Sequence, residues 1–186
     1  MTEGSILETR YAKTVDGVHI AYQVVGEGPI DLVVVTTVLG LGEIWRGRRV
    51  GIFFRTLASF SRLIVLDRRG TGVSDHVVRD HQLSLENRME DIRAVMDAAG
   101  STRAVLLALE SGGLHVAAMF ATTLPERTAG LIAYGSTARQ LWAPDYPFGA
   151  TQDQLDAEFA GDVLPLLEHR GKRTPDTDHL VRMDVA

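Results

Sequence analysis

Residues 105–113, which read Val-Leu-Leu-Ala-Leu-Glu-Ser-Gly-Gly, constrain the fold more than any other part of this chain. An apolar run ends in a small polar residue and two glycines, and an apolar stretch typical of a helix follows. This order predicts a buried strand, a tight turn and a buried helix, with Ser111 at the apex. A serine at that place is exposed above a sheet, and the next backbone N–H lies at a helix N-terminus. The segment therefore predicts a strand-turn-helix unit that presents a nucleophilic hydroxyl.

The remaining sequence alternates between expected strands and expected helices. The strands are expected at 9–14, 18–25, 31–37, 62–67, 104–109 and 130–135, and the helices at about 50–59, 84–99, 112–123 and 151–169. Asp16-Gly17 is a strong signal for a two-residue hairpin between the first two strands, and Ser84 is a good N-cap. The alternation predicts an α/β fold: a mostly parallel, doubly wound sheet with an N-terminal antiparallel hairpin at one edge.

Composition restricts the class of protein and of partner. The chain has 186 residues, of which 45% are apolar, so we expect one soluble domain with a substantial core. A net charge of -5 gives no reason to expect nucleic acid or an anionic membrane as partner. The absence of cysteine excludes disulfides, a thiolate nucleophile and a cysteine-based zinc site. No cofactor or metal is expected, since Asp176-Thr-Asp178-His179 is more typical of a solvated tail than of a metal site.

The N-terminus lacks the basic and apolar regions of a signal peptide, and no apolar run reaches membrane-spanning length. The expected location is cytoplasmic.

Three segments carry a resemblance to a known superfamily: the turn at 67–75 (Asp-Arg-Arg-Gly-Thr-Gly-Val-Ser-Asp), the turn at Ser111, and Pro125-Glu-Arg127 before the strand at 130–135. With them, residues 9–149 resemble the α/β-hydrolase superfamily. The spacing of 14 residues from Ser111 to Pro125 matches the register of that superfamily and places Ser111, not Glu110, at the nucleophile position.

Shorter segments look closest to hydrolase-like domains that precede class III adenylate cyclase domains in some bacterial proteins; they are 10–12, 20–24, 57–60 and 141–147. No cyclase segment is present. The resemblance implies a hydrolase core with its first six strands in 1–149, and the start of a cap or lid and a tail in 150–186. The C-terminal strands that carry the late acid and histidine of the superfamily are missing.

The resemblance also implies roles for particular residues. Ser111 is the expected nucleophile, and the expected oxyanion hole combines the N–H of Gly112 with that of Thr37 or Val38. Leu109 stands where the pattern G-x-S-x-G has its first glycine, and it adds volume at a place where the superfamily has small residues.

A serine hydroxyl is a poor nucleophile unless a base takes its proton. His169 or His179 could act as that base and Asp145 could orient it, although a turn, helix or tail role is more typical of all three positions. His115 is expected to be a buried, hydrogen-bonded helix residue. Glu110 is expected to be a structural or rim carboxylate.

The glycine-rich turn at 70–75 superficially suggests a dinucleotide site, but it lacks the third glycine and no helix follows at once. A tight turn in which Asp67 and Arg68 lock the neighbouring loops is the preferred interpretation.

Two classes of function remain open. The first is a serine hydrolase of apolar, ester-like substrates that uses Ser111 and is completed by a His and an Asp from outside these residues. The second is a catalytically inactive hydrolase-like module that senses a ligand or binds a partner, since fold does not establish function. The expected ligand is a small apolar ester-like molecule. Self-association through the edge of the strand at 130–135 is also expected, because no later strand covers that edge.

Overall fold

The computed structural model describes residues 7–76 and 83–157. The chain divides into two compact units, Met1–Ala138 and Arg139–Ala186. The domain boundary expected between 149 and 150 therefore lies inside the second unit.

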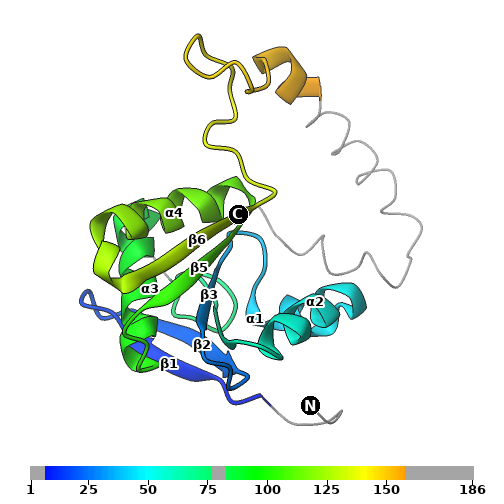
Figure 1. The fold of residues 1–186 in the computed structure, drawn as a ribbon. Coiled ribbons are helices and arrows are strands. Elements are labelled where there is room, and N and C mark those ends of the chain that lie inside the picture. The colour runs from blue at the N-terminus through cyan, green and yellow to red at the C-terminus, as the bar shows by residue number, and fades with distance from the viewer. Residues whose placement is uncertain (1–6, 77–82, 158–186) are drawn as a thin grey trace. The chain divides into compact units, whose positions relative to one another are not determined.

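The first unit contains a six-stranded sheet in the order β1-β2-β4-β3-β5-β6 (Figure 1). Its strands are β1 (Arg10–Lys13), β2 (His19–Val25), β3 (Asp31–Val35), β4 (Arg62–Leu66), β5 (Ala104–Leu109) and β6 (Thr128–Tyr134). β1 and β2 are antiparallel to each other, and β2 is antiparallel to β4, whereas β4, β3, β5 and β6 run parallel. The predicted α/β class and the antiparallel N-terminal hairpin are confirmed.

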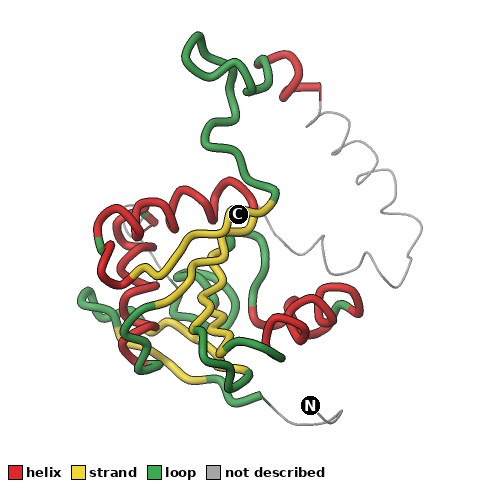
Figure 2. Tube along the Cα trace, in the orientation of Figure 1, coloured by secondary structure: helices red, strands yellow, loops and turns green. Residues whose placement is uncertain are grey.

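Helices cover both faces of this sheet, as Figures 1 and 2 show. α1 (Leu41–Arg46) and α2 (Arg48–Ala58) cover one face, and α3 (Leu85–Ala98) and α4 (Glu110–Thr123) cover the other. Successive residues of a strand point to opposite faces, so Ile64 packs with the α3 and α4 side while Leu63 and Val65 pack with the α1 and α2 side. The continuous apolar runs of the sequence follow from burial on both faces.

Helix α3 begins where the sequence indicates, whereas the hairpin loop differs from its prediction. The Ser84 hydroxyl accepts the N–H of Asn87 at 3.3 Å and caps α3. In the loop between β1 and β2, the N–H of Thr14 donates to the carbonyl of Val18, so three residues and not two lie between the paired positions. The Thr14 hydroxyl stabilises this longer loop by accepting the N–H of Val18.

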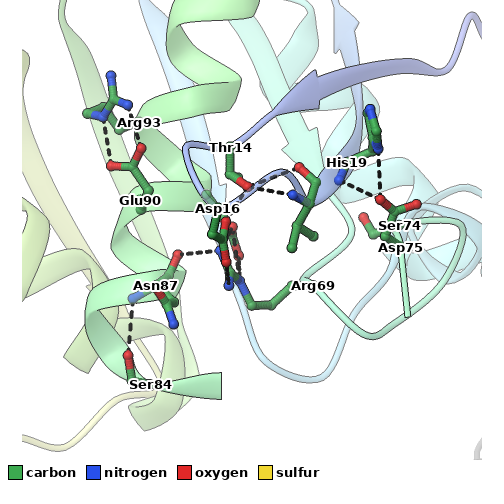
Figure 3. Close-up of polar contacts among 12 residues, drawn as sticks. Thr14, Asp16, His19, Arg69, Ser74, Asp75, Ser84, Asn87, Glu90 and Arg93 are labelled. Carbon is green, nitrogen blue, oxygen red and sulfur yellow. Dashed lines mark hydrogen bonds and ion pairs between the residues drawn. The ribbon is translucent and has the colours of Figure 1, made fainter. Parts of the chain in front are cut away.

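The loop after β4 is held by a buried arginine (Figure 3). The Arg69 side chain is fully buried and donates to the Asp91 carboxylate at 2.6 Å and to the Asp16 carboxylate at 2.9 Å. A buried charge is tolerated when it is paired and hydrogen-bonded. Arg69 therefore connects the hairpin loop of β1 and β2 to helix α3.

Asp67, at the end of β4, holds two further loops. Its carboxylate accepts the N–H of Leu41 at 2.7 Å and the N–H of Val73 at 2.9 Å. The predicted locking role is confirmed for Asp67. It is wrong for Arg68, because the neighbouring Arg69 makes the locking contacts, while the Arg68 side chain has no hydrogen bond or ion pair among residues 7–76 and 83–157.

The second unit is described as far as residue 157. Two short bridges, Leu141 with Ala150 and Ala143 with Tyr146, shape its loop. Residues 152–157 are helical, and the Thr151 hydroxyl caps them by accepting the N–H of Gln154 at 3.3 Å. The helix expected at 151–169 therefore begins as predicted, and its later part lies outside the described residues. No helix within the described part of the chain is long and apolar enough to cross a membrane.

Candidate active site

The turn between β5 and α4 has its apex at Glu110. Strand β5 ends at Leu109 and helix α4 begins at Glu110, which has a φ of 51°. Among the described residues, Glu110 is the one non-glycine residue with positive φ. A side chain in this left-handed region is strained and requires support from its surroundings. The prediction that Ser111 occupies the apex is therefore wrong, because Ser111 lies one residue later, inside the first turn of α4.

The residues on either side explain this register. Ala108 is fully buried, and a Cβ added to Gly112 would lie 2.6 Å from Oγ1 of Thr37. Small residues therefore stand two positions before and two positions after Glu110. An apex at Ser111 would instead place Leu109 at the first crowded position. The sequence therefore contains small residues that indicate an apex at Glu110. A comparison with G-x-S-x-G that places the serine at the centre does not detect them.

The carboxylate of Glu110 turns back toward the loop after β3. Its Oε1 accepts the N–H of Thr37 at 2.6 Å, the Thr37 hydroxyl at 2.9 Å and the N–H of Gly113 at 3.0 Å. Its Oε2 accepts the hydroxyl of Thr36 at 2.8 Å. Backbone N–H groups that point at a carboxylate are the same kind of donor that an oxyanion hole uses. The Glu110 carboxylate therefore occupies backbone N–H donors beyond the carboxyl ends of β3 and β5.

The three expected oxyanion residues lie beyond the carboxyl ends of the parallel strands β3 and β5. Thr37 and Val38 follow β3, and Gly112 lies in the first turn of α4, against the side chain of Thr37. The N–H of Thr37 is bound by Glu110, and the N–H of Val38 donates to the Thr36 hydroxyl at 3.3 Å. Both backbone donors after β3 are therefore already engaged inside the chain.

Ser111 has a different partner from the one a serine nucleophile needs. Its Oγ accepts the N–H of Thr137 at 3.0 Å and lies 2.9 Å from the Thr137 hydroxyl. Within the described part of the chain, no histidine is hydrogen-bonded to Ser111. The arrangement holds the hydroxyl against the loop after β6.

His115 is hydrogen-bonded but not buried. Its Nε2 lies 3.2 Å from the carbonyl oxygen of Ala138. The buried residues of α4 are Gly113, Val116, Ala117 and Phe120, so His115 falls on the exposed side of the helix. The predicted hydrogen bond is confirmed and the predicted burial is wrong.

The remaining acid and base candidates are not brought to this site by the described residues. Asp145 belongs to the second unit, where it is exposed and lies 3.6 Å from Arg139. His169 and His179 lie outside the described residues, as does the segment 176–179. Among residues 7–76 and 83–157, no group of three or more His, Asp or Glu side chains could hold a metal ion.

Two cavities flank the turn. An open pocket of about 490 Å³ is lined by Glu110 together with Val38, Phe53, Leu109 and Tyr134. The rings of Phe53 and Tyr134 are 6.5 Å apart across it. Arg49 also lines this pocket. A mainly apolar pocket with a few polar groups is typical of a small-molecule site.

A smaller cavity of about 30 Å³ lies behind Thr36 and Thr37, the residues that hold the Glu110 carboxylate. Arg68 and Arg88 also line this cavity. The two cavities therefore differ mainly in size, because apolar side chains form most of the lining of both.

Comparisons with known proteins agree with this fold. Residues 32–181 match the alpha/beta hydrolase fold family. The esterase RhEst1 from Rhodococcus sp. ECU1013 is 31% identical, with a TM-score of 0.59 over 69% of this chain and 46% of that one. Est816, an N-acyl homoserine lactone degrading enzyme, is 29% identical, with a TM-score of 0.57 over 68% of this chain and 45% of that one.

A third solved structure that resembles the chain is the bottromycin epimerase BotH in complex with bottromycin A2. It is 25% identical, with a TM-score of 0.61 over 82% of this chain and 55% of that one. Among curated proteins, no match was found. The chain spans about half the length of the solved structures that it resembles.

Proposed function

Because the chain belongs to the α/β-hydrolase fold family, we propose that it is a ligand-binding, hydrolase-like module that does not use Ser111 as a nucleophile. The observation that carries this proposal is the position of Glu110. Its strained backbone stands at the apex where this fold presents a nucleophile, and its carboxylate binds Thr37 N–H. A carboxylate in that place repels the negative charge that develops on an ester during hydrolysis.

The environment of Ser111 supports the same proposal. A serine hydroxyl needs a neighbouring base before it can attack an ester. Here its Oγ accepts a hydrogen bond from Thr137 N–H, which lowers the electron density available for attack. The serine hydrolase predicted from the sequence would need a base hydrogen-bonded to Ser111, and it would need Ser111 in place of Glu110 at the apex of the turn.

The apolar pocket beside Glu110 supports binding of a small apolar ligand. Val38, Phe53 and Tyr134 are all partly exposed and line it. The fold itself does not decide between hydrolysis and binding, and the solved structures that resemble this chain include two hydrolytic enzymes and an epimerase. A sensing role would suit the resemblance to domains that precede adenylate cyclases, and that link stays a prediction, as does the cytoplasmic location.

Serine chemistry and binding can be tested separately on this chain. A fluorophosphonate probe and 4-nitrophenyl butyrate report a reactive serine, with Ser111→Ala as the reference. We expect the unmodified chain and Ser111→Ala to show the same labelling and the same ester turnover, so that neither signal depends on Ser111. Labelling of the unmodified chain that Ser111→Ala abolishes would contradict the proposal and restore the serine hydrolase.

Binding is measured by titrating the ¹⁵N-labelled chain with 4-nitrophenyl butyrate and following backbone amide shifts. We expect saturable shifts around Val38 and Tyr134, and a weaker affinity in Tyr134→Ala. Tyr11→Ala is the matched control, because Tyr11 is an exposed tyrosine on β1, at the opposite edge of the sheet. Equal affinity in both variants, or no saturable shift, would show that this pocket does not bind the ligand.

A further inference from the structure

The junction of α1 and α2 carries three arginines that have no acidic partner. Arg46 ends α1, Arg48 and Arg49 begin α2, and all three are exposed. Within residues 7–76 and 83–157, none of these three side chains makes an ion pair or a hydrogen bond. The arginines that do pair with a carboxylate lie elsewhere in the chain: Arg10, Arg62, Arg69, Arg93, Arg127 and Arg139.

Nearby acidic groups do not neutralise this charge. Glu43 is the one acidic residue of 41–58, and its carboxylate accepts the N–H of Gly40 at 3.0 Å. Glu110, which lines the neighbouring pocket, is held by hydrogen bonds from the loop after β3. Glu27 lies in the loop between β2 and β3, which contacts the other end of α2. The junction is therefore locally positive although the whole chain has a net charge of -5.

The two arginines at the start of α2 do not stabilise that helix. A helix N-terminus carries partial positive charge, so cations in the first turn are unfavourable and acidic residues are favoured. Arg48 and Arg49 lie in the first turn of α2, which has no acidic residue, and its N-cap, Gly47, supplies no side-chain hydrogen bond. Helix stability therefore does not account for this charge, and an external anion would compensate it.

Exposed apolar side chains lie one helical turn after these arginines. Ile52 is 54% exposed and follows Arg48 by four residues, and Phe53 is 41% exposed and follows Arg49 by four residues. Residues four apart are neighbours on the same face of a helix. The opposite side of α2 packs on the sheet (Figure 1). The outer side of α2 therefore presents guanidinium groups and apolar side chains together to solvent.

We propose that the α1–α2 junction, defined by Arg46, Arg48, Arg49, Ile52 and Phe53, docks on the surface of an anionic lipid bilayer. Guanidinium groups bind lipid phosphates, while apolar and aromatic side chains enter the boundary between head groups and acyl chains. A bilayer satisfies both kinds of group at once. Arg49 and Phe53 also line the pocket of about 490 Å³, so docking would place this pocket beside a source of apolar molecules. The proposal goes beyond the proposed function, because it does not depend on what the pocket binds.

Docking is tested by co-sedimentation of the chain with vesicles of phosphatidylcholine alone and of phosphatidylcholine mixed with phosphatidylglycerol. We expect saturable binding to the mixed vesicles, little binding to the neutral vesicles, and weaker binding at high salt, because salt screens the charges. Equal binding to both kinds of vesicle, or no binding to the mixed vesicles, would overturn the proposal. Binding of poly-glutamate without binding of mixed vesicles would assign the junction to an acidic protein and would also overturn it.

Variants locate the docking surface. Arg46→Gln and Arg48→Gln should each weaken binding to the mixed vesicles by roughly fivefold, and Ile52→Ser should weaken it through lost apolar contact. Arg103→Gln and Val15→Ser are the matched controls, since both positions are exposed but lie before β5 and in the β1–β2 loop. All five changes are at exposed positions, and circular dichroism checks that each variant is folded. Equal weakening by the controls would show that the α1–α2 junction is not the docking surface.

Discussion

The backbone N–H of Thr37 donates a 2.6 Å hydrogen bond to the carboxylate of Glu110, 73 residues further along the chain. This contact joins the loop after β3 to the start of α4, at the carboxyl ends of two neighbouring parallel strands. Loops at this edge of an α/β sheet are where such folds bind ligands. In this chain the edge is held together by a residue with strained backbone, whose side chain takes up donors that a bound ligand could otherwise use.

The close approach of α4 to β3 depends on Gly113. A Cβ at this position would lie 2.2 Å from the carbonyl oxygen of Val35, which is backbone and cannot move aside cheaply. We expect Gly113→Ala to lower the free energy of unfolding by about 1–3 kcal/mol. Gly42→Ala is the matched control, because Gly42 lies in helix α1 with no atom within 4 Å of an added Cβ. That control should be neutral or stabilising by up to about 1 kcal/mol in urea unfolding. Equal destabilisation by both changes would contradict the described packing of α4.

The acid side of the stability profile should depend on Asp16. The hydrogen bond from the Thr14 hydroxyl, followed by the contacts with Arg69, lowers the pKa of Asp16 below its ordinary value of 3.8. An acid with a lowered pKa in the folded state stabilises the fold above its unfolded pKa, and this contribution is lost as pH falls through the folded value. Asp16→Asn should therefore make the free energy of unfolding fall less steeply below about pH 4. Urea unfolding at a series of pH values measures both slopes, and identical slopes would contradict the assigned shift.

Strand β6 is the edge strand of the described sheet, and Leu131, Ile132 and Tyr134 are exposed on it. We propose that this edge pairs with a second copy of the chain, because an exposed apolar edge presents unpaired backbone groups. Ile132→Lys should shift the chain toward monomer in analytical ultracentrifugation. Ile52→Lys is the control, since Ile52 is similarly exposed but lies on α2. A stable wild-type monomer at tens of micromolar would contradict self-association.

Local sequence signals predicted most of the fold. Apolar runs such as 31–35 read as strands because both faces of the sheet are covered, and the cap and periodicity of α3 lie within the helix itself. Helix α1 was not predicted, because the N–H of Leu41 is held by Asp67, which lies 26 residues away in the sequence. Contacts between distant segments leave no local pattern.

The site was harder to predict for the same reason. The choice between Glu110 and Ser111 depends on which residue takes positive φ, and the small pair Ala108 and Gly112 was the local clue. The partners of the Glu110 carboxylate come mainly from Thr36 and Thr37. Leu109, expected to crowd the turn, is 8% exposed and belongs to the core on the α1 and α2 side.

The position of the apex can be measured most directly with four variants and their urea unfolding free energies: Glu110→Ala, Glu110→Gly, Ser111→Ala and Ser111→Gly. Both changes at 110 remove the carboxylate, so their difference reports the backbone alone. Glycine tolerates positive φ, and Glu110→Gly should therefore be more stable than Glu110→Ala by about 1 kcal/mol. At position 111, inside a helix, the order should reverse by about the same amount. Alanine more stable than glycine at 110, with glycine preferred at 111, would contradict the account and return the apex to the serine.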